Sequence, residues 1–220
     1  MEIILLFVIL FVCVTISVPI GFSLAAATVT CFMLYTNTSL LQIAQYLTSG
    51  LDSFPMLAIP YFILAGIIMS KGGVARRLVN LFMSFIGHFR GGLGVVMTVT
   101  CCFFGAISGS ATATTSAIGG VMTPEMKEKG YPAGFCSALA ATAGIIGIII
   151  PPSIAFVIYG VITNTSVSDL FLAGIIPGIL ITIALSVLCV VIAHKENLPT
   201  IPRQSWKQRA RAFRHAKWSV

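Results

Sequence analysis

The sequence predicts an all-α polytopic membrane protein, from its composition, its mean hydropathy and the spacing of its apolar runs. Hydrophobic residues make up 57% of the 220 residues and charged residues 9%, whereas about 25% charge is typical of a soluble domain. The mean hydropathy is +1.02. Apolar runs recur along the whole chain, as expected of helices that need about 20 apolar residues to cross a bilayer. An ordinary soluble domain is therefore excluded.

The basic residues predict how the chain is threaded through the membrane. The 13 Lys and Arg residues against 6 Asp and Glu residues give a net charge of +7, which in a soluble protein would suggest a nucleic-acid partner. Here they fall into three groups, at residues 71–90, 127–129 and 194–220. If the last group is cytoplasmic and the spans alternate, all three lie inside, while loops 36–52 and 160–169, which lack Lys and Arg, lie outside. We expect a multi-pass protein with its N-terminus outside, its C-terminal tail in the cytoplasm and no nucleic-acid partner.

The cysteines and the N-terminus show no feature of a secreted protein. All six cysteines lie in apolar segments and none belongs to a C-x-x-C pair, so we expect small apolar side chains rather than disulfides or metal ligands. Residues 1–17 are apolar, contain Glu2 and lack a basic start, which favours a membrane span over a cleavable signal peptide. The cysteines are Cys13, Cys31, Cys101, Cys102, Cys136 and Cys189.

Three spans and one surface helix are expected in the N-terminal part of the chain. Residues 3–16 and 20–35 are apolar runs separated by Pro19, which favours a tight turn between two short spans over a single kinked helix. Residues 54–70 form the third span. Residues 74–89 carry apolar side chains on one face, which predicts an amphipathic helix in the membrane interface. That face consists of Val74, Leu78, Leu81, Phe82 and Phe85.

A cluster of serine and threonine residues at positions 104–116 predicts a re-entrant hairpin. The apolar runs on either side, residues 93–104 and 117–122, are each too short to cross a bilayer. With a turn at residues 108–110, where Gly109 has no Cβ to obstruct it, the two runs enter and leave the membrane on one side. Lipid cannot form hydrogen bonds with the backbone N–H and C=O groups that the turn leaves without a partner. The tip must therefore lie against protein or line a wet cavity.

A second interruption is expected where Pro151, Pro152 and Ser153 follow the apolar run 133–150. Proline lacks an N–H group and clashes with the preceding turn, so the helix stops there and resumes at residues 154–161. The amide end of the second half has partial positive charge, and the last carbonyls of the first half favour a cation. A re-entrant hairpin together with a broken helix is typical of the sites of secondary transporters.

The hairpin tip and the helix break predict an ion site without charged side chains. No ionisable residue lies deep in any expected span, so a proton relay has no candidate. Sodium is the expected coupling ion, because hydroxyl and backbone carbonyl oxygens are suitable ligands for it. The first candidates are the side chains of Ser108 and Ser110, with carbonyls near residues 147–151 opposite. The expected sodium-binding set is Ser108, Gly109, Ser110, Gly147 and Pro151.

The half-helix amide ends predict that the solute is a small anion. Such ends at Ser110–Ala111 and at Ser153 can hold a carboxylate without a buried lysine. The hydroxyls of Thr112, Thr114 and Thr115 allow a second interpretation, in which they bond back to carbonyls one turn earlier. For the Ser-Gly-Ser tip itself, the alternative is close helix packing by small residues. The expected substrate-binding set is Ser110, Ala111, Thr112, Pro152 and Ser153.

Several motifs support a family assignment. The chain contains GAISGSATATT at residues 105–115, PEM at 124–126, GY at 130–131, GIIIPPSI at 147–154, GLDSFP at 50–55, IPYFILAG at 59–66 and AGIIPG at 173–178. Together these motifs resemble the large membrane subunit of a TRAP (tripartite ATP-independent periplasmic) transporter, a family of the ion transporter superfamily. The match covers nearly all of the chain but only half of the family's pattern. Family members continue into a second, inverted repeat with its own hairpin.

The resemblance implies a sodium-coupled permease of the bacterial inner membrane that imports small carboxylates such as dicarboxylic acids, sugar acids and sialic acid. The implied partners are a periplasmic substrate-binding protein, a small four-helix membrane subunit and the missing second half of the large subunit. No cofactor is implied apart from sodium, whose site lies between the hairpin tip and the broken helix. The distribution of basic residues predicts that the N-terminus is periplasmic. Helix 74–89 resembles an arm that braces the moving hairpin domain against the scaffold, and a surface helix without a mechanical role is the alternative.

The chain is accordingly divided into five predicted segments. These are scaffold transmembrane helices at 1–70, an amphipathic interfacial arm helix at 71–90, the re-entrant hairpin at 91–122, the broken helix and final span at 123–193, and a basic cytoplasmic tail or linker at 194–220.

Two other functions are weighed against transport. The chain is expected to be a truncated or split half, so a non-transporting structural or assembly fragment is the first alternative. The pair Gly109-Ser110 also suggests an intramembrane serine hydrolase, which needs a histidine or lysine base at the same depth. His88, His194 and His215 all lie in expected cytoplasmic segments. We therefore expect that the protein is not an enzyme.

Overall fold

The computed structural model describes residues 2–36, 39–52 and 54–216. Every regular element in these residues is a helix, which confirms the all-α prediction. The chain divides into two compact units, Met1–Phe54 and Pro55–Val220. The end of the predicted basic tail, residues 217–220, lies outside the described part of the chain.

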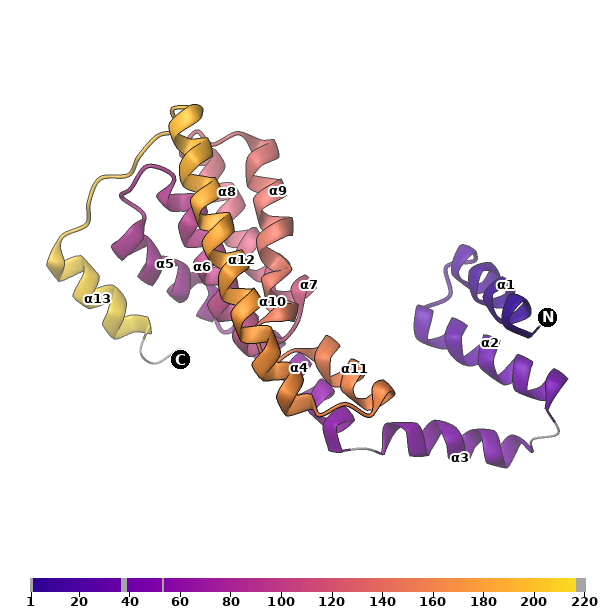
Figure 1. Ribbon diagram of the computed structural model, residues 1–220. Coiled ribbons are helices and arrows are strands. Elements are labelled where there is room, and N and C mark those ends of the chain that lie inside the picture. The colour runs from indigo at the N-terminus through magenta and orange to yellow at the C-terminus, as the bar shows by residue number, and fades with distance from the viewer. Residues whose placement is uncertain (1, 37–38, 53, 217–220) are drawn as a thin grey trace. The chain divides into compact units, whose positions relative to one another are not determined.

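The first unit contains α1 (Glu2–Thr15), α2 (Ile20–Tyr35) and α3 (Leu40–Leu51). Helices α1 and α2 pack side by side (Figure 1). The chain turns between them at Ser17, whose φ is 65°, so two helices joined by a tight turn are observed rather than one kinked helix. Helix α3 begins at a capping box, in which Ser39 and Gln42 each bond the backbone of the other.

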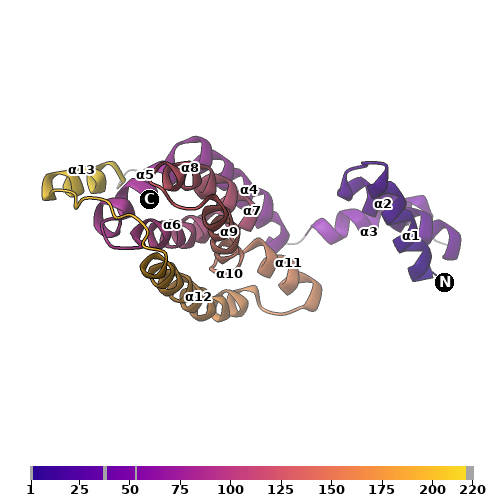
Figure 2. The same cartoon turned by 90° about the horizontal axis from the view of Figure 1, so that it is seen from above.

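Helix α6 (Gly92–Ser108) lies at the centre of the second unit. It packs against α5 (Val74–Ile86), α9 (Ala133–Gly144) and α12 (Val167–Lys195), and Figures 1 and 2 show this arrangement from two sides. A Cβ built on Gly94 would lie 2.8 Å from the Cys189 sulfur, so a glycine is needed where α6 and α12 approach closely. The most deeply buried apolar side chains of α6, each at most 1% exposed, are Leu93, Val96, Met97, Cys101 and Phe104.

The second limb of the hairpin is helical from the tip onwards. It consists of α7 (Ala111–Thr114), a π-helical turn η1 (Thr115–Gly119) and α8 (Gly120–Glu128). A Cβ on Gly144 of α9 would collide with the Thr115 hydroxyl, so the π-helical turn lies where this limb comes very close to α9. The limb passes residue 122, the predicted end of the hairpin, without a break and continues to Glu128.

The broken helix begins with α9 and the short α10 (Ile146–Ile149) and resumes as α11 (Ile154–Thr163). Its two halves are bent by 46° relative to each other. The peptide bond between Pro151 and Pro152 is cis. Because neither proline has an N–H group to donate to the preceding turn, the first half ends at these residues.

Helix α12 is, among the described residues, the one helix that is by itself long and apolar enough to cross a membrane. It begins at Ser166, whose hydroxyl accepts from the Asp169 N–H at 3.3 Å. The bent pair formed by α9–α10 and α11 passes the same test of length and composition as one broken span. Helix α4 (Phe54–Lys71) precedes α5.

Helix α5 packs on protein along one face. Its buried residues include Ala75, Leu78, Val79 and Met83, which belong to the same core cluster as residues of α6, and α5 packs on α6. Of the residues expected on the apolar face, Leu78 is buried but Phe85 is 40% exposed. Val74 and Phe82 pack partly buried against the core. The buried face therefore overlaps the expected one and extends to Ala75, Val79 and Met83.

The basic tail contains α13 (Trp206–Ala216), an element not expected from its composition. The helix begins at a capping box in which Ser205 and Gln208 bond each other's backbone N–H groups, at 2.9 and 3.4 Å. It packs on α5. Arg209, 6% exposed, stacks its guanidinium 5.8 Å from the Phe85 ring centre and 5.3 Å from that of Trp206. The contact with Phe85 joins α13 to α5, whereas Trp206 lies in α13 itself.

Candidate functional site

The hairpin tip and the helix break meet directly. The Ile154 N–H, the first of α11, donates a hydrogen bond of 3.2 Å to the Gly109 carbonyl oxygen at the tip. Gly109 has a φ of 62°, in the left-handed region that favours glycine. A Cβ on Gly109 would also lie 2.9 Å from the Pro152 carbonyl oxygen, so only glycine fits against the break.

Two further glycines let the hairpin and the broken helix cross without side chains between them. A Cβ on Gly105 of α6 would collide with the Cα of Gly147 in α10. A Cβ on Gly147 would in turn lie 2.5 Å from the Thr114 hydroxyl and 3.1 Å from the Ser110 carbonyl oxygen. From α4, Gly66 approaches Ser108 so closely that its Cβ would lie 3.3 Å from the Ser108 Cβ. The junction is thus assembled from both limbs of the hairpin, the broken helix and α4.

Hydroxyl groups form a buried hydrogen-bonded chain inside the tip. Ser108 is 1% exposed and Thr114 is fully buried, and their hydroxyl oxygens lie 3.0 Å apart. The Thr114 hydroxyl donates to the Ser110 carbonyl oxygen at 2.8 Å, which leaves the Ser108 hydroxyl as the donor to Thr114. Hydroxyl oxygens have two acceptor lone pairs each. Several oxygens therefore gather at the junction without any ionisable side chain.

Two serines cap the N-terminal ends of helices at the junction. The Ser110 hydroxyl accepts from the Ala113 N–H at 3.4 Å and so caps α7. Ser153, fully buried, accepts from the Phe156 N–H at 3.3 Å and donates to the Ile148 carbonyl oxygen at 2.6 Å. Ser153 therefore caps α11 and also bridges the break. Both caps leave neighbouring backbone amides of the first turn without a helical partner.

The expected site residues are brought together to different degrees. Ser108, Gly109, Ser110, Gly147, Pro152 and Ser153 take part in the contacts described above. Thr112 is exposed and bonds the Ser110 hydroxyl at 3.1 Å, so it lies on the outer side of the tip. Ala111 contributes a carbonyl oxygen that lies near Gly144. Pro151 is half-buried within the break.

Thr114 and the Gly105–Gly147 contact have a larger part in the junction than the sequence predicted. The Thr114 hydroxyl does bond back to a carbonyl one turn earlier, at Ser110, and it also bonds Ser108. The signal for the glycine contact was present in the two glycine-containing motifs, since small residues allow close helix approach in membranes. Which glycine meets which could not be inferred from either motif alone.

Titratable groups with displaced pKa values outside the spans lie at the other end of the hairpin. Burial raises the pKa of the Glu125 carboxyl in α8, and the nearby Lys129 opposes this effect. Burial also raises the pKa of Tyr131 to about 12, so its phenol stays protonated at neutral pH and donates to the Pro199 carbonyl oxygen at 3.5 Å. Among the described residues, no group of three or more His, Cys, Asp and Glu side chains could hold a metal ion.

An apolar all-helical chain in which a hairpin tip meets a broken helix defines a membrane protein of the secondary-transporter class. Over residues 7–220, the chain matches the family model described as tripartite ATP-independent periplasmic transporter, DctM component. The chain therefore belongs to this family of large permease components and corresponds to its N-terminal half. These permeases are inner-membrane proteins and are not enzymes, so the serine hydrolase alternative is excluded.

Curated relatives show the same assignment. The C4-dicarboxylate TRAP transporter large permease protein of Vibrio cholerae is 38% identical over all of this chain and 49% of its own length. The ectoine/5-hydroxyectoine TRAP transporter large permease protein of Ruegeria pomeroyi is 43% identical over 80% of this chain and 41% of its own. The sialic acid TRAP transporter permease protein of Haemophilus influenzae is 40% identical over 93% of this chain and 33% of its own. The chain thus spans half or less of the length of these relatives.

Proposed function

We propose that this chain forms one repeat of a sodium-coupled TRAP permease that imports a small carboxylate across the bacterial inner membrane. The observation that supports this most directly is the junction of the hairpin tip with the helix break, where Ile154 bonds Gly109. Interrupted helices that meet in this way expose backbone carbonyls and amides to a ligand at membrane depth.

Sodium is the proposed coupling ion because the junction offers neutral oxygens. The Ser108 and Ser110 side chains, and the backbone carbonyls of Gly109, Gly147 and Pro151, are the proposed ligands. Ser108 is buried beside Thr114, whose hydroxyl orients the Ser108 oxygen. An ion held this way needs no charged side chain, in agreement with the absence of ionisable residues at positions 104–116 and 147–154.

The proposed solute is a small carboxylate held by backbone amides. The first turns capped by Ser110, with Ala111 and Thr112, and by Ser153 favour negative charge. Pro152 has no N–H group and would border the carboxylate without donating to it. The caps formed by Ser110 and Ser153 are consistent with this role because they order both first turns. Relatives named for C4-dicarboxylates, ectoine and sialic acid define the range of solutes to test.

The proposed assembly includes a periplasmic binding protein, a small membrane subunit and the second repeat of the large subunit. The proposed orientation places the N-terminus in the periplasm and the basic tail in the cytoplasm. Helix α5, which packs on the hairpin limb α6 along one face, is the proposed arm between the hairpin domain and the scaffold.

Sodium-dependent thermal stability tests the ion site without needing the solute. We expect NaCl to raise the melting temperature of the purified chain above that in KCl of equal ionic strength, because a ligand that binds only the folded state stabilises it. Sodium at ten times its Kd would add roughly 1.4 kcal/mol. The double variant Ser108→Ala plus Ser110→Ala should lose most of this difference.

The matched control is Thr142→Ala plus Thr163→Ala. Both hydroxyls bond back to a carbonyl of their own helix, in α9 and α11, and lie outside the junction. The control should keep the full sodium effect. Equal melting temperatures in NaCl and KCl for the wild type, or an unchanged sodium effect in the double serine variant, would remove the proposed site.

A further inference from the structure

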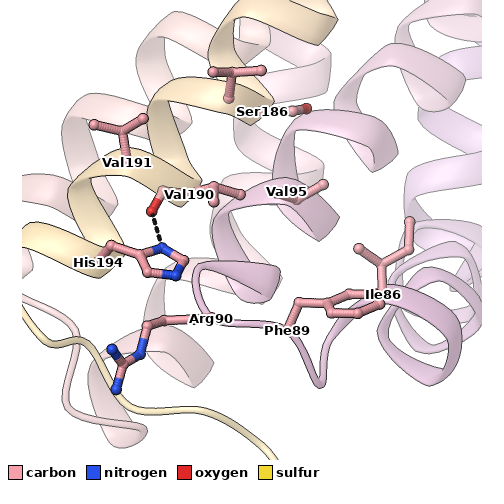
Figure 3. A pocket seen from close by; sticks show the side chains of 9 residues that line it. Ile86, Phe89, Arg90, Val95, Ser186, Val190, Val191 and His194 are labelled. Carbon is pink, nitrogen blue, oxygen red and sulfur yellow. Dashed lines mark hydrogen bonds between the residues drawn. The ribbon is translucent and has the colours of Figure 1, made fainter.

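A groove outside the junction lies between the end of α5, the start of α6 and the last turns of α12 (Figure 3). Its volume is about 590 Å³, within the range of about 300–1,000 Å³ typical of small-molecule sites. Most of its wall is apolar and is formed by Ile86, Phe89, Val95, Val187, Val190 and Val191. It shares no residue with the proposed sodium or carboxylate site.

One part of the groove is basic. Arg90 and His194 line it, and among the described residues that do so none is acidic. The His194 Nδ1 lies 2.9 Å from the Val190 carbonyl oxygen, as the dashed line in Figure 3 marks. Because a carbonyl oxygen only accepts, Nδ1 is the donor in this bond. Nε2 donates to an anion only in the imidazolium form of the ring, whereas the Arg90 guanidinium always presents several N–H donors.

The basic part and the apolar part lie at different depths of the membrane. His194 lies in the last turn of α12, next to Lys195, where the span reaches the interface. The valines lie up to two turns deeper, and Val187 and Val191 are each 56% exposed on the outer surface of the helix. A ligand that fits both parts has an apolar tail and an anionic head.

We propose that this groove binds an anionic phospholipid, with one acyl chain along the valines of α12 and the phosphate between Arg90 and His194. Charge complementarity favours a lipid over an apolar protein helix, because a helix without acidic side chains would leave Arg90 without a counter-charge when it covered the groove. A phosphate accepts charge-assisted hydrogen bonds from a guanidinium in a bidentate geometry. The lipid would thereby connect the end of α5 to the end of α12.

Native mass spectrometry of the full chain in detergent tests the lipid and its charge. The probes are phosphatidylglycerol and phosphatidylcholine with identical acyl chains. We expect phosphatidylglycerol to be retained and phosphatidylcholine to be lost. Arg90→Gln should weaken phosphatidylglycerol binding about fivefold, which is about 1 kcal/mol at 1.4 kcal/mol per tenfold, and Arg90→Gln plus His194→Gln should abolish the preference.

The matched control is Arg214→Gln, which removes the same charge from the exposed face of α13 and should leave lipid binding unchanged. Equal retention of the two lipids, or an equal loss in the control, would overturn the proposal. Inorganic phosphate distinguishes a lipid site from a simple anion site. If phosphate displaces phosphatidylglycerol at matched concentration, the acyl chain contributes nothing and the proposal fails.

A second measurement locates the acyl chain and does not depend on the substitutions of Arg90 and His194. Phosphatidylglycerol with a diazirine on its acyl chain should crosslink to the peptide that contains Val187 and Val191. Val187→Trp keeps Arg90 and His194 but fills the groove, so it should reduce this crosslink at least fivefold. Crosslinks spread evenly over the exposed surface of α12, or a crosslink that Val187→Trp leaves unchanged, would show that no lipid occupies the groove.

Discussion

Single glycines and hydroxyls determine whether the hairpin tip and the helix break can meet. Gly105 and Gly147 leave no room for a Cβ between α6 and α10, and Gly109 bends the tip against Pro152. Within that contact, the buried Thr114 hydroxyl joins Ser108 to the Ser110 carbonyl oxygen. Chemical groups as small as a methyl or a hydroxyl therefore decide the geometry of the site.

Gly105→Ala should destabilise the chain. The added methyl group would collide with the Gly147 backbone, and overpacking of this kind costs about 1–3 kcal/mol. We expect a melting temperature several degrees below that of the wild type, measured by thermal unfolding of the purified chain in detergent.

Gly120→Ala is the matched control for this substitution. A Cβ on Gly120 meets nothing within 4 Å, and alanine is favoured over glycine within a helix by up to about 1 kcal/mol. This variant should be as stable as the wild type or more so. A melting temperature of Gly105→Ala equal to that of Gly120→Ala would contradict the close contact between α6 and α10.

At the scale of whole elements, local side-chain caps define the N-terminal ends of two helices outside the junction, α3 and α13. Ser39 begins α3 and Ser205 begins α13, each through a capping box with a glutamine three residues later. In both cases the serine accepts a backbone N–H that would otherwise have no partner. The helix in the basic tail thus has a local cause in addition to its packing on α5.

Ser205→Ala should loosen α13 without affecting α3. Loss of an N-cap costs about 1 kcal/mol, which corresponds to roughly fivefold faster opening. Hydrogen–deuterium exchange of the first-turn amides of α13 should accelerate by this factor. Ser39→Ala provides the reciprocal control, since it should accelerate exchange in α3 alone. Unchanged exchange in α13 would mean that the capping box does not stabilise this helix.

The interruptions of the chain could be predicted from sequence because their signals are local. Gly109 allows the left-handed backbone of the tip, and neither Pro151 nor Pro152 can donate an N–H to the preceding turn. The contact of Gly105 with Gly147 could not be predicted, because it depends on how two distant helices cross. Helix α13 was missed because its basic composition suggested a solvated tail, although the Ser205–Gln208 signature of a helix start was present. The face of α5 that is buried depended in the same way on its neighbour α6.

At the scale of the whole molecule, the chain spans half or less of the length of the three relatives named above. We expect no sodium-dependent solute uptake from residues 1–220 alone in proteoliposomes, because the solute cavity of this family would be open where the second repeat packs. Adding the second repeat in trans, together with the small subunit and the binding protein, should restore uptake. Succinate, ectoine and sialic acid form the panel of labelled solutes. Uptake by the chain alone would contradict the need for a second repeat.

The hydrogen bond between Ile154 and Gly109 has a mechanical consequence for such a carrier. Among the described residues, it joins the hairpin tip to the start of α11 through the backbone, beside the close contact of Gly105 with Gly147. A ligand that binds beside this hydrogen bond would contact both segments and hold them together as one rigid unit. The ligand-free permease would then be more flexible at this junction than the ligand-bound one, and this flexibility would distinguish the two states.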